Sequence, residues 1–192
     1  MTTLATSGIT AEQFLELDDN GLELVDGEIV ESELSALSAY VATRLVVRMS
    51  AHADAGGLGL VFGAGSGIAI WPDKPDKVRK PDGMFFTNGK FPEGIPATGW
   101  IRVSPDIALE VVSPRDSAEE LDKKLRDYRQ AGIPLVWVIY PATRSGHAYR
   151  GRTVRPVFEE DALDGEDIFP GFRLPLSQFF AAVAAEGVNT EA

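Results

Sequence analysis

Two ionisable residues stand in apolar surroundings in the middle of the chain. Glu110 interrupts the short apolar run 107–112, and Lys124 falls in the next segment, whose apolar residues have helical spacing. Lys124 comes three residues after Leu121 and four before Tyr128, which places all three on one face of the expected helix. A buried charge is costly unless it is paired, so such residues are either partners or parts of a functional site. We therefore expect Glu110 and Lys124 to meet.

The elements that carry these charges form a strand–helix–strand unit. The apolar runs 107–112 and 135–140 are bounded by proline and predict strands buried on both faces. Between them, Ser117 and Glu120 have the spacing of a helix-capping box, and Gly132 supplies a C-terminal stop. Two buried strands joined by one helix are expected to run parallel, in a right-handed crossover.

A third charged residue, Asp82, begins another apolar strand, predicted at 83–86. It would lie near Glu110 if the two strands are neighbours in the sheet. Carboxylates on adjacent strands bind hard divalent cations such as Mg²⁺ or Mn²⁺. Such a metal would lower the pKa of a bound water, and a nearby lysine would orient the nucleophile or stabilise a pentavalent phosphorus. The alternative is that Glu110 and Lys124 form a buried ion pair with no catalytic role.

Other catalytic systems find little support. His52 and His147 are far apart and fall in different expected elements, which does not favour a zinc site or a Ser-His-Asp triad. The chain has no cysteine, so it has neither disulfides nor thiolate metal sites. The segment GAGSG at 63–67 lacks the Gly-Lys-Ser/Thr ending and the following helix of a phosphate loop.

Positive charge is concentrated in the polar loop 71–80, which carries Lys74, Lys77, Arg79 and Lys80. This loop is either a solvated turn or a rim that contacts phosphate. The net charge of the whole chain is −11, which argues against a broadly electropositive nucleic-acid binder. A homodimer that gathers two such loops around one groove would offset that charge.

The rest of the chain predicts one mixed α/β domain. Its 192 residues are enough for a substantial core, and its hydrophobic content of 44% is ordinary for a globular protein. Periodicity and turn residues predict a short helix capped by Thr10, a hairpin across Asp26-Gly27, a long helix over 35–55, strands at 58–62 and 68–70, a loop over 87–103, a hairpin of 146–150 with 153–158, and a helix from Leu176.

We expect a single domain over residues 1–192, with a core at about 8–180 and flexible termini. No apolar run approaches the length of a membrane span, and the first residues lack the features of a signal peptide. A cytoplasmic location is the resulting expectation.

Asp82 after Pro81, Glu110 in IALEVVSP and Lys124 in the following helix resemble the PD-(D/E)XK nuclease motif with a migrated lysine. The usual motif places the lysine two residues after the glutamate, where this chain has Val112. The chain as a whole resembles the Uma-two-type family of restriction-endonuclease-like proteins over roughly residues 8–180. The resemblance rests on AEQFLELDDNGLELVDGEIVES, KPDGMFF, SPDIALEVVSP, KLRDYRQAGIPLVWVIYP and FPGFRLPLSQFF.

The resemblance implies a restriction-endonuclease-like fold, with a central mixed sheet flanked by helices, and a nuclease-like site, but it does not show which substrate the site takes. Our first hypothesis is a Mg²⁺- or Mn²⁺-dependent nuclease that hydrolyses DNA. Asp82 and Glu110 would be the metal ligands, Lys124 the catalytic lysine and Glu23 an accessory residue. Relatives often carry a histidine early in the long helix, where this chain has Ser38. That departure favours the alternative of a catalytically inactive binding or regulatory module. A hydrolase of small phosphorylated molecules is a third hypothesis.

Overall fold

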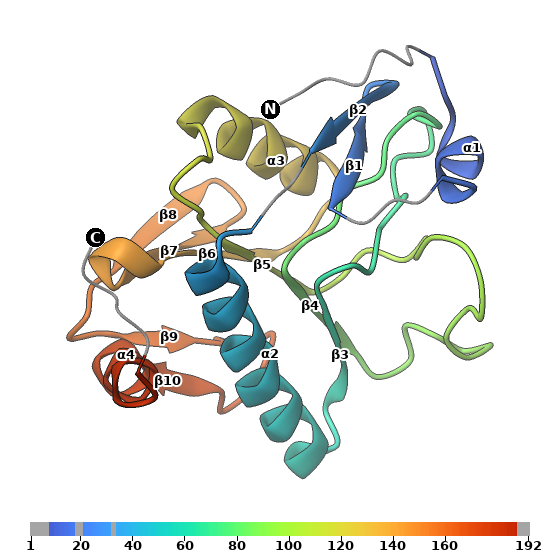
Figure 1. The fold of residues 1–192 in the computed structure, drawn as a ribbon. Coiled ribbons are helices and arrows are strands. Elements are labelled where there is room, and N and C mark those ends of the chain that lie inside the picture. The colour runs from blue at the N-terminus through green and yellow to red at the C-terminus, as the bar shows by residue number, and fades with distance from the viewer. Residues whose placement is uncertain (1–7, 18–20, 32–33, 188–192) are drawn as a thin grey trace.

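The structure is a computed structural model that describes residues 8–17, 21–31 and 34–187. At its centre lies a six-stranded sheet in the order β3-β4-β5-β6-β7-β8 (Figure 1). Strands β5 and β6 run parallel, and the other neighbouring pairs are antiparallel, so the expected mixed sheet is confirmed. Its strands are β3 (Gly59–Gly63), β4 (Gly83–Thr87), β5 (Ile107–Val111), β6 (Leu135–Tyr140), β7 (Ser145–Arg150) and β8 (Thr153–Val157).

Helices cover both faces of this sheet (Figure 1). Helix α3 and the β1–β2 hairpin lie on one side, and α2 with α4 and the small β9–β10 sheet lie on the other. The further elements are α1 (Ala11–Leu15), β1 (Leu22–Val25), β2 (Glu28–Glu31), α2 (Ala36–Gly56), α3 (Ala118–Gln130), the 3₁₀ turn η1 (Pro141–Thr143), β9 (Ala162–Asp164), β10 (Arg173–Pro175) and α4 (Leu176–Ala185).

The strand–helix–strand unit forms as expected. Strand β5 pairs in parallel with β6, and Ile107 lies opposite Leu135. Helix α3 connects them and begins at the capping box of Ser117 and Glu120. Because successive strand residues point to opposite faces, Ile107, Leu109 and Val111 pack toward α2, whereas Ala108 packs toward α3. Glu110 has the parity of Ala108 and therefore points toward α3.

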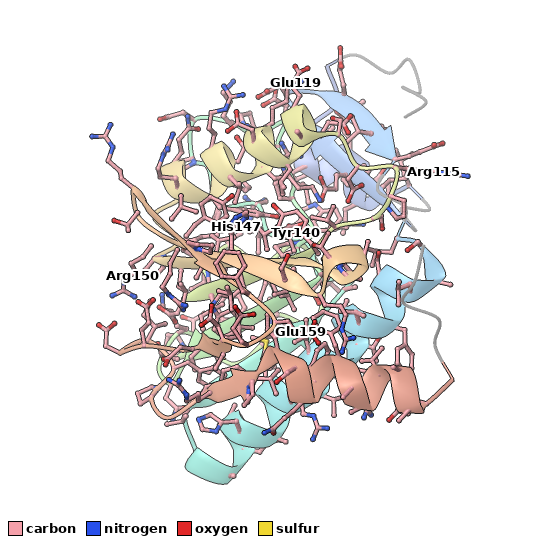
Figure 2. All side chains as sticks on the ribbon, turned by 90° about the vertical axis from the view of Figure 1, so that its left-hand side faces the viewer. Arg115, Glu119, Tyr140, His147, Arg150 and Glu159 are labelled. Atoms are coloured by element: carbon pink, nitrogen blue, oxygen red, sulfur yellow. The ribbon has the colours of Figure 1, made fainter. Side chains whose placement is uncertain are left out.

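The predicted hairpin near the C-terminal third is also confirmed as β7 and β8, joined through Gly151 and Arg152. Strand β8 is the edge of the sheet. In the view of Figure 2, Tyr140 and His147 lie beneath α3, on the same side of the sheet as that helix. This face is covered less completely than the α2 face, since both side chains are only partly buried.

The strand predicted at 68–70 is wrong. Ile68 forms only single bridges, with Arg79 and with Ile101, and its neighbours make no continuous ladder. The segment packs instead as an irregular piece beneath α1, where Ala69 and Trp100 are buried. The flexibility predicted for the termini falls largely on residues 1–7 and 188–192, which lie outside the described residues. Within the described ranges, no helix is both long enough and apolar enough to cross a membrane.

Candidate functional site

Glu110 and Lys124 meet, as the sequence predicts. The Lys124 ammonium Nζ lies 3.2 Å from Oε2 of Glu110 and 3.1 Å from Oε1 of Glu23. Both carboxylates are buried, and the Lys124 side chain is 15% exposed. The hydroxyl of Tyr128 donates a hydrogen bond to the other oxygen of Glu110. Strand β5, helix α3 and strand β1 thus each contribute a side chain to one cluster.

Asp82 joins this cluster from the start of β4. Strands β4 and β5 are neighbours, and Gly83 lies opposite Leu109. The buried Asp82 carboxylate accepts the backbone N–H of Val111 through Oδ2 at 2.7 Å. No hydrogen bond to its other oxygen comes from the described part of the chain. The two strands thus bring Asp82 beside the residue that follows Glu110, as expected for strand neighbours.

The two strand carboxyl groups carry strongly perturbed acidity. Burial, followed by the negative charge of Glu110, raises the pKa of Asp82 to about 8. Burial also raises the pKa of Glu110, although Lys124 and the Tyr128 hydroxyl act in the opposite direction. Ionising these two carboxyl groups therefore costs free energy in the folded protein, and a bound cation would lower that cost.

Lys124 is an ammonium ion in this arrangement. Burial alone would lower its pKa, but the charges of Glu110, Glu23 and Asp82 raise it well above the usual value. Burial would likewise raise the pKa of Glu23, yet Lys124 and Arg79 hold it below its ordinary range. Lys124 can therefore donate hydrogen bonds and stabilise negative charge, and it does not act as a general base here.

A second layer of buried charge supports the first. Arg79 donates through NH1 to Oε2 of Glu23 at 2.9 Å and through NH2 to Oδ2 of Asp127 at 2.6 Å. Lys77 donates to the other oxygen of Asp127 at 2.5 Å. Asp127 lies on α3, three residues after Lys124. The ion pairs thus run without a break from Lys77 to Glu110.

Both expectations for the loop 71–80 are therefore wrong for its central residues. Lys77 and Arg79 are 5% and 4% exposed, so they neither form a solvated turn nor reach phosphate. Lys74 is exposed and pairs with Asp26 at 3.2 Å. Lys80 is partly buried, with its Nζ 5.4 Å from the ring centroids of Phe14 and Trp100. Of these four residues, Lys77 and Arg79 therefore contribute their charge mainly to internal ion pairs.

Ser38, at the position where the resemblance leads us to expect a histidine, makes a structural contact. Its hydroxyl donates to the backbone carbonyl of Val112 at 3.1 Å, and it lies 2.8 Å from the Ser35 hydroxyl. Ser38 is buried in the first turn of α2. It therefore joins the start of the long helix to the end of β5, close to Glu110 in the chain.

The cluster opens to the surface through a small cavity of about 30 Å³. Its lining includes Glu110, Lys124 and Leu121, together with Asp116 and Glu120 at the beginning of α3. A volume of about 30 Å³ matches the share of one water molecule in the liquid. Water or a small cation can enter this opening, whereas a phosphate group must sit at its mouth.

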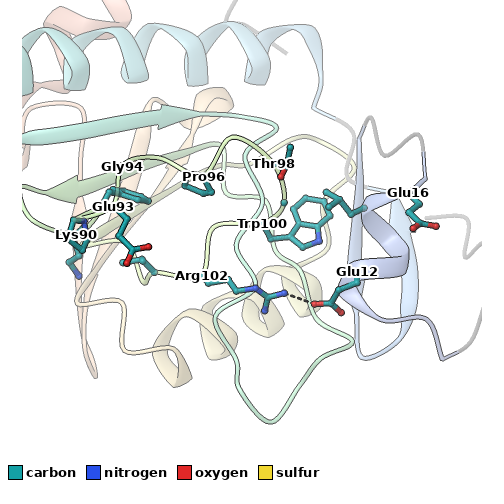
Figure 3. Close-up of a pocket in the computed structure, with 14 residues that line it drawn as sticks. Glu12, Glu16, Lys90, Glu93, Gly94, Pro96, Thr98, Trp100 and Arg102 are labelled. Atoms are coloured by element: carbon teal, nitrogen blue, oxygen red, sulfur yellow. Dashed lines mark hydrogen bonds and ion pairs between the residues drawn. The ribbon is translucent and has the colours of Figure 1, made fainter.

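A larger cavity, of about 670 Å³, lies elsewhere, between α1 and the loop 87–103 (Figure 3). Its lining is mainly apolar and includes Trp100 and Phe91. Arg102 and Glu12 form an ion pair at 2.5 Å across one side of it. None of the predicted site residues lines this cavity, so its size does not make it the site of the chemistry.

The donor set of the cluster fits a hard divalent cation. Asp82 and Glu110 can supply oxygen ligands; burial first, and neighbouring carboxylates second, raise their pKa values, and a bound cation would favour their ionised forms. No group of three or more acidic or histidine side chains is preformed as a metal site within the described residues.

The raised pKa of Asp82 leads to a prediction on stability. Its ordinary value is 3.8, so between about pH 4 and pH 8 the unfolded chain has released a proton that the folded protein keeps. Without metal, this residue should therefore make the protein less stable as pH rises, by up to about 1.4 kcal/mol per pH unit. Asp82→Asn should remove that contribution.

Urea unfolding of both proteins at several pH values, with chelator present, measures this difference. The stability of Asp82→Asn relative to the wild type should increase from pH 5 to pH 8. Asparagine can still accept the Val111 N–H, so the backbone contact is retained. A difference that stays constant across this range would show that Asp82 titrates normally.

A mixed sheet in which a lysine of the crossover helix pairs with Glu110 of β5, while Asp82 precedes the neighbouring strand β4, matches a fold of the restriction-endonuclease-like class. The chain belongs to the Uma2 family, described as "Putative restriction endonuclease", whose sequence model matches residues 11–177. The family expected from the sequence is therefore confirmed. A search of curated protein sequences finds no match.

One solved structure supports the same fold. It is a crystal structure from Anabaena variabilis ATCC 29413, described as a "putative nuclease belonging to DUF820". It superposes with a TM-score of 0.76 and 18% sequence identity, over 91% of this chain and 98% of that chain. At this identity the likeness establishes the fold, and the expected fold class is confirmed.

Proposed function

We propose that this protein is a Mg²⁺- or Mn²⁺-dependent endonuclease that hydrolyses phosphodiester bonds of DNA. The observation that carries the proposal is that Glu110 of β5 and Lys124 of α3 meet at one small opening, with the buried Asp82, just before β4, bound to the neighbouring Val111 N–H. Its membership of a family described as restriction endonucleases supports the same reaction class. Perturbed acidity in the same cluster is typical of catalytic sites.

In this proposal Asp82 and Glu110 hold the metal, which when bound lowers the pKa of a water ligand and offsets phosphate charge. Lys124 donates hydrogen bonds to the phosphate oxygens in this proposal. Its ammonium group lies beside Glu110, at the opening where a phosphate would sit, and can stabilise the charge that develops on phosphorus-bound oxygen. Glu23 fixes the position of that ammonium group from the opposite side.

Tyr128 has a positioning role in the same scheme. It is fully buried, and its hydroxyl holds one oxygen of Glu110. Burial and the charge of Glu110 raise the pKa of this hydroxyl well above its usual value, so it stays a hydrogen-bond donor across the physiological range. The orientation of the Glu110 carboxylate is thereby set by Tyr128 on one oxygen and Lys124 on the other.

Metal binding should raise thermal stability by linkage. A ligand present at about 100 times its Kd stabilises the folded protein by about 2.7 kcal/mol. We expect Mn²⁺ to raise the melting temperature of the wild type and to have no such effect on Asp82→Asn. Differential scanning fluorimetry across a Mn²⁺ titration measures both shifts, with Ca²⁺ and chelator as references.

A cleavage assay completes this test. Labelled DNA should be cut in the presence of Mn²⁺ and left intact in chelator. Equal stabilisation of the wild type and Asp82→Asn would place the metal elsewhere. Metal binding at Asp82 without cleavage of any DNA would instead favour a binding or regulatory module that keeps the nuclease fold.

A further inference from the structure

A second polar cavity lies on the α3 side of the sheet, about 120 Å³ in volume, between α3 and the β7–β8 hairpin. Three arginines line it: Arg126 and Arg129 from α3, and Arg152 from the hairpin turn. Tyr149 of β7 forms part of its floor. One acidic residue, Asp122, lines it as well. The lining thus carries an excess of positive charge in a chain whose net charge is −11.

The three arginines differ in whether an acidic side chain pairs with them. Arg126 pairs with Asp122 at 2.9 Å on the surface of α3. Arg129 and Arg152 are exposed and form no ion pair with any residue that the structure describes. An exposed guanidinium with no internal partner is available to an anion, and its planar fork matches a phosphate group.

Aromatic side chains continue from this cavity toward the candidate site. Tyr140, His147 and Tyr149 form a row at the sheet surface, with ring centroids 5.4 Å apart for the first pair and 6.0 Å for the second. All three are partly buried. The Nδ1 atom of His147 lies 3.3 Å from the Tyr140 hydroxyl, which fixes the two rings edge to face. Figure 2 shows Tyr140 and His147 side by side beneath α3.

The sheet register places this row close to the candidate site. Glu110 lies opposite Val138 on β6, and Val138 lies opposite His147 on β7. All three side chains point to the α3 face. Two strand spacings separate Glu110 from His147, a distance of about 10 Å across the sheet. A single strand several nucleotides long, the usual extent of such a binding site, covers this distance.

We propose that the arginine–aromatic groove, formed by Tyr140, His147, Tyr149, Arg126, Arg129 and Arg152, binds a single strand of nucleic acid beside the candidate site. That the bound strand is also the substrate rests on the proposed function, whereas binding of the strand to the groove does not. Arginines contact phosphates, and the tyrosine and histidine rings offer surfaces on which unpaired bases stack. A duplex keeps its bases stacked internally and cannot use those rings.

The groove also accounts for how an acidic chain holds a polyanion. Nucleic-acid affinity comes largely from a few local phosphate contacts rather than from net charge. Within the loop 71–80, Lys77 and Arg79 are buried and held by internal ion pairs, so they contribute little to such contacts. Arg129 on α3 and Arg152 in the β7–β8 turn are exposed and line the same cavity on the α3 side of the sheet.

Fluorescence anisotropy with labelled oligo(dT) of about 12 nucleotides tests the groove, since site sizes of this order are usual for single-strand binding. Chelator in the buffer prevents cleavage. We expect Arg129→Glu and Arg152→Glu each to weaken binding about tenfold and to reduce the slope of log K against log salt. Arg155→Glu is the matched control, on the opposite face of the same hairpin, and should change the affinity less than about twofold.

The aromatic row has its own test. Tyr149→Leu keeps an apolar side chain over the sheet and removes the stacking surface, and should weaken oligo(dT) binding at least about fivefold. Melting temperatures of all variants confirm that they are folded. Equal losses for Arg152→Glu and Arg155→Glu, a preference for duplex over single strand, or the absence of oligo(dT) binding by the wild type would each overturn the groove.

The two proposals fail in different ways. Oligo(dT) binding that depends on Arg129 and Arg152, in a protein that cuts no DNA with Mn²⁺, keeps the groove and ends the nuclease proposal. Mn²⁺-dependent cleavage that Arg129→Glu and Arg152→Glu leave unchanged, with normal binding, ends the groove and keeps the nuclease.

Discussion

Lys124→Ala is expected to abolish Mn²⁺-dependent DNA cleavage, with a loss of at least about 10²-fold in rate. The ammonium group of Lys124 contacts both Glu110 and Glu23 and faces the opening where a phosphate would sit. Alanine removes the positive charge that stabilises the transition state, and the metal alone cannot replace it at that position. The rate is measured with labelled DNA at saturating Mn²⁺.

The adjacent lysine provides the control. Lys123 lies on the exposed side of α3, where it pairs only with Glu119 among the described residues, at 3.1 Å. Lys123→Ala should cleave DNA at close to the wild-type rate. Cleavage by Lys124→Ala at the rate of Lys123→Ala would remove Lys124 from the mechanism.

Folding of the Lys124 variant needs a separate check, because its removal leaves three buried carboxyl groups near one another: Glu23, Asp82 and Glu110. Lys124→Gln retains a hydrogen-bond donor of similar length and provides a second inactive variant if alanine unfolds the protein. Circular dichroism and the melting temperature establish that either variant is folded. A folded Lys124→Gln with full activity would contradict the charge-based role.

Local signals in the sequence predict the elements that hold this site. The capping box of Ser117 and Glu120 starts α3 where expected, and the pair Asp26-Gly27 turns β1 into β2 with positive φ at both residues, 49° and 80°. Proline-bounded apolar runs gave β5 and β6 within one residue. Each of these signals acts over a few residues, so a short segment of the chain is enough to predict where the helix or strand begins and ends.

The buried ion pairs of Lys77 and Arg79 with Asp127 could not be predicted from such local signals. Lys77 and Arg79 lie in a polar, proline-containing stretch, and nothing in that stretch distinguishes a solvated lysine from one paired with Asp127 about 50 residues later. One signal was available on α3. Asp127 precedes the inward Tyr128 and follows Lys124 by three residues, so it stands on the edge of the buried face.

The burial of Glu23 could not be predicted from local sequence either. Its residue type and position in β1 give no hint of burial, since a short hairpin strand with alternating charges predicts an exposed carboxylate. Only the family resemblance singled it out. In the structure it is 1% exposed, and it links Arg79 of the second layer to Lys124 of the first.

Asp127→Asn should be among the most destabilising single substitutions outside the hydrophobic core. Asp127 is 6% exposed and receives hydrogen bonds from Lys77 and Arg79, which are buried as well. Removing one partner of a buried ion pair costs about 3–5 kcal/mol. The expected loss lies toward the lower end, because Arg79 keeps Glu23 and Lys77 keeps the half-exposed Asp26 as partners. Urea unfolding should show a large decrease in the midpoint with an unchanged slope.

Asp122→Asn is the control on the same helix. Asp122 is exposed and pairs with Arg126 at 2.9 Å, and exposed pairs of this kind contribute at most about 0.5 kcal/mol. Similar losses for the two variants would mean that burial of Asp127 does not determine its contribution. Because Arg79 bridges Asp127 and Glu23, Asp127→Asn should also lower the cleavage rate in protein that remains folded.

A third variant tests whether the instability of Asp127→Asn comes from the buried charge of Lys77. Without the Asp127 charge, Lys77 keeps only the half-exposed Asp26 carboxylate, at 3.4 Å, as an ion-pair partner. If the instability of Asp127→Asn arises from this buried cation, then Lys77→Met in the same chain should recover part of the lost stability, because it removes the charge and keeps the methylene stem. The double-mutant cycle measures that coupling directly. Additive losses from Lys77→Met and Asp127→Asn would show that the two residues stabilise the protein independently. In that case the second layer would not act as one network behind Lys124.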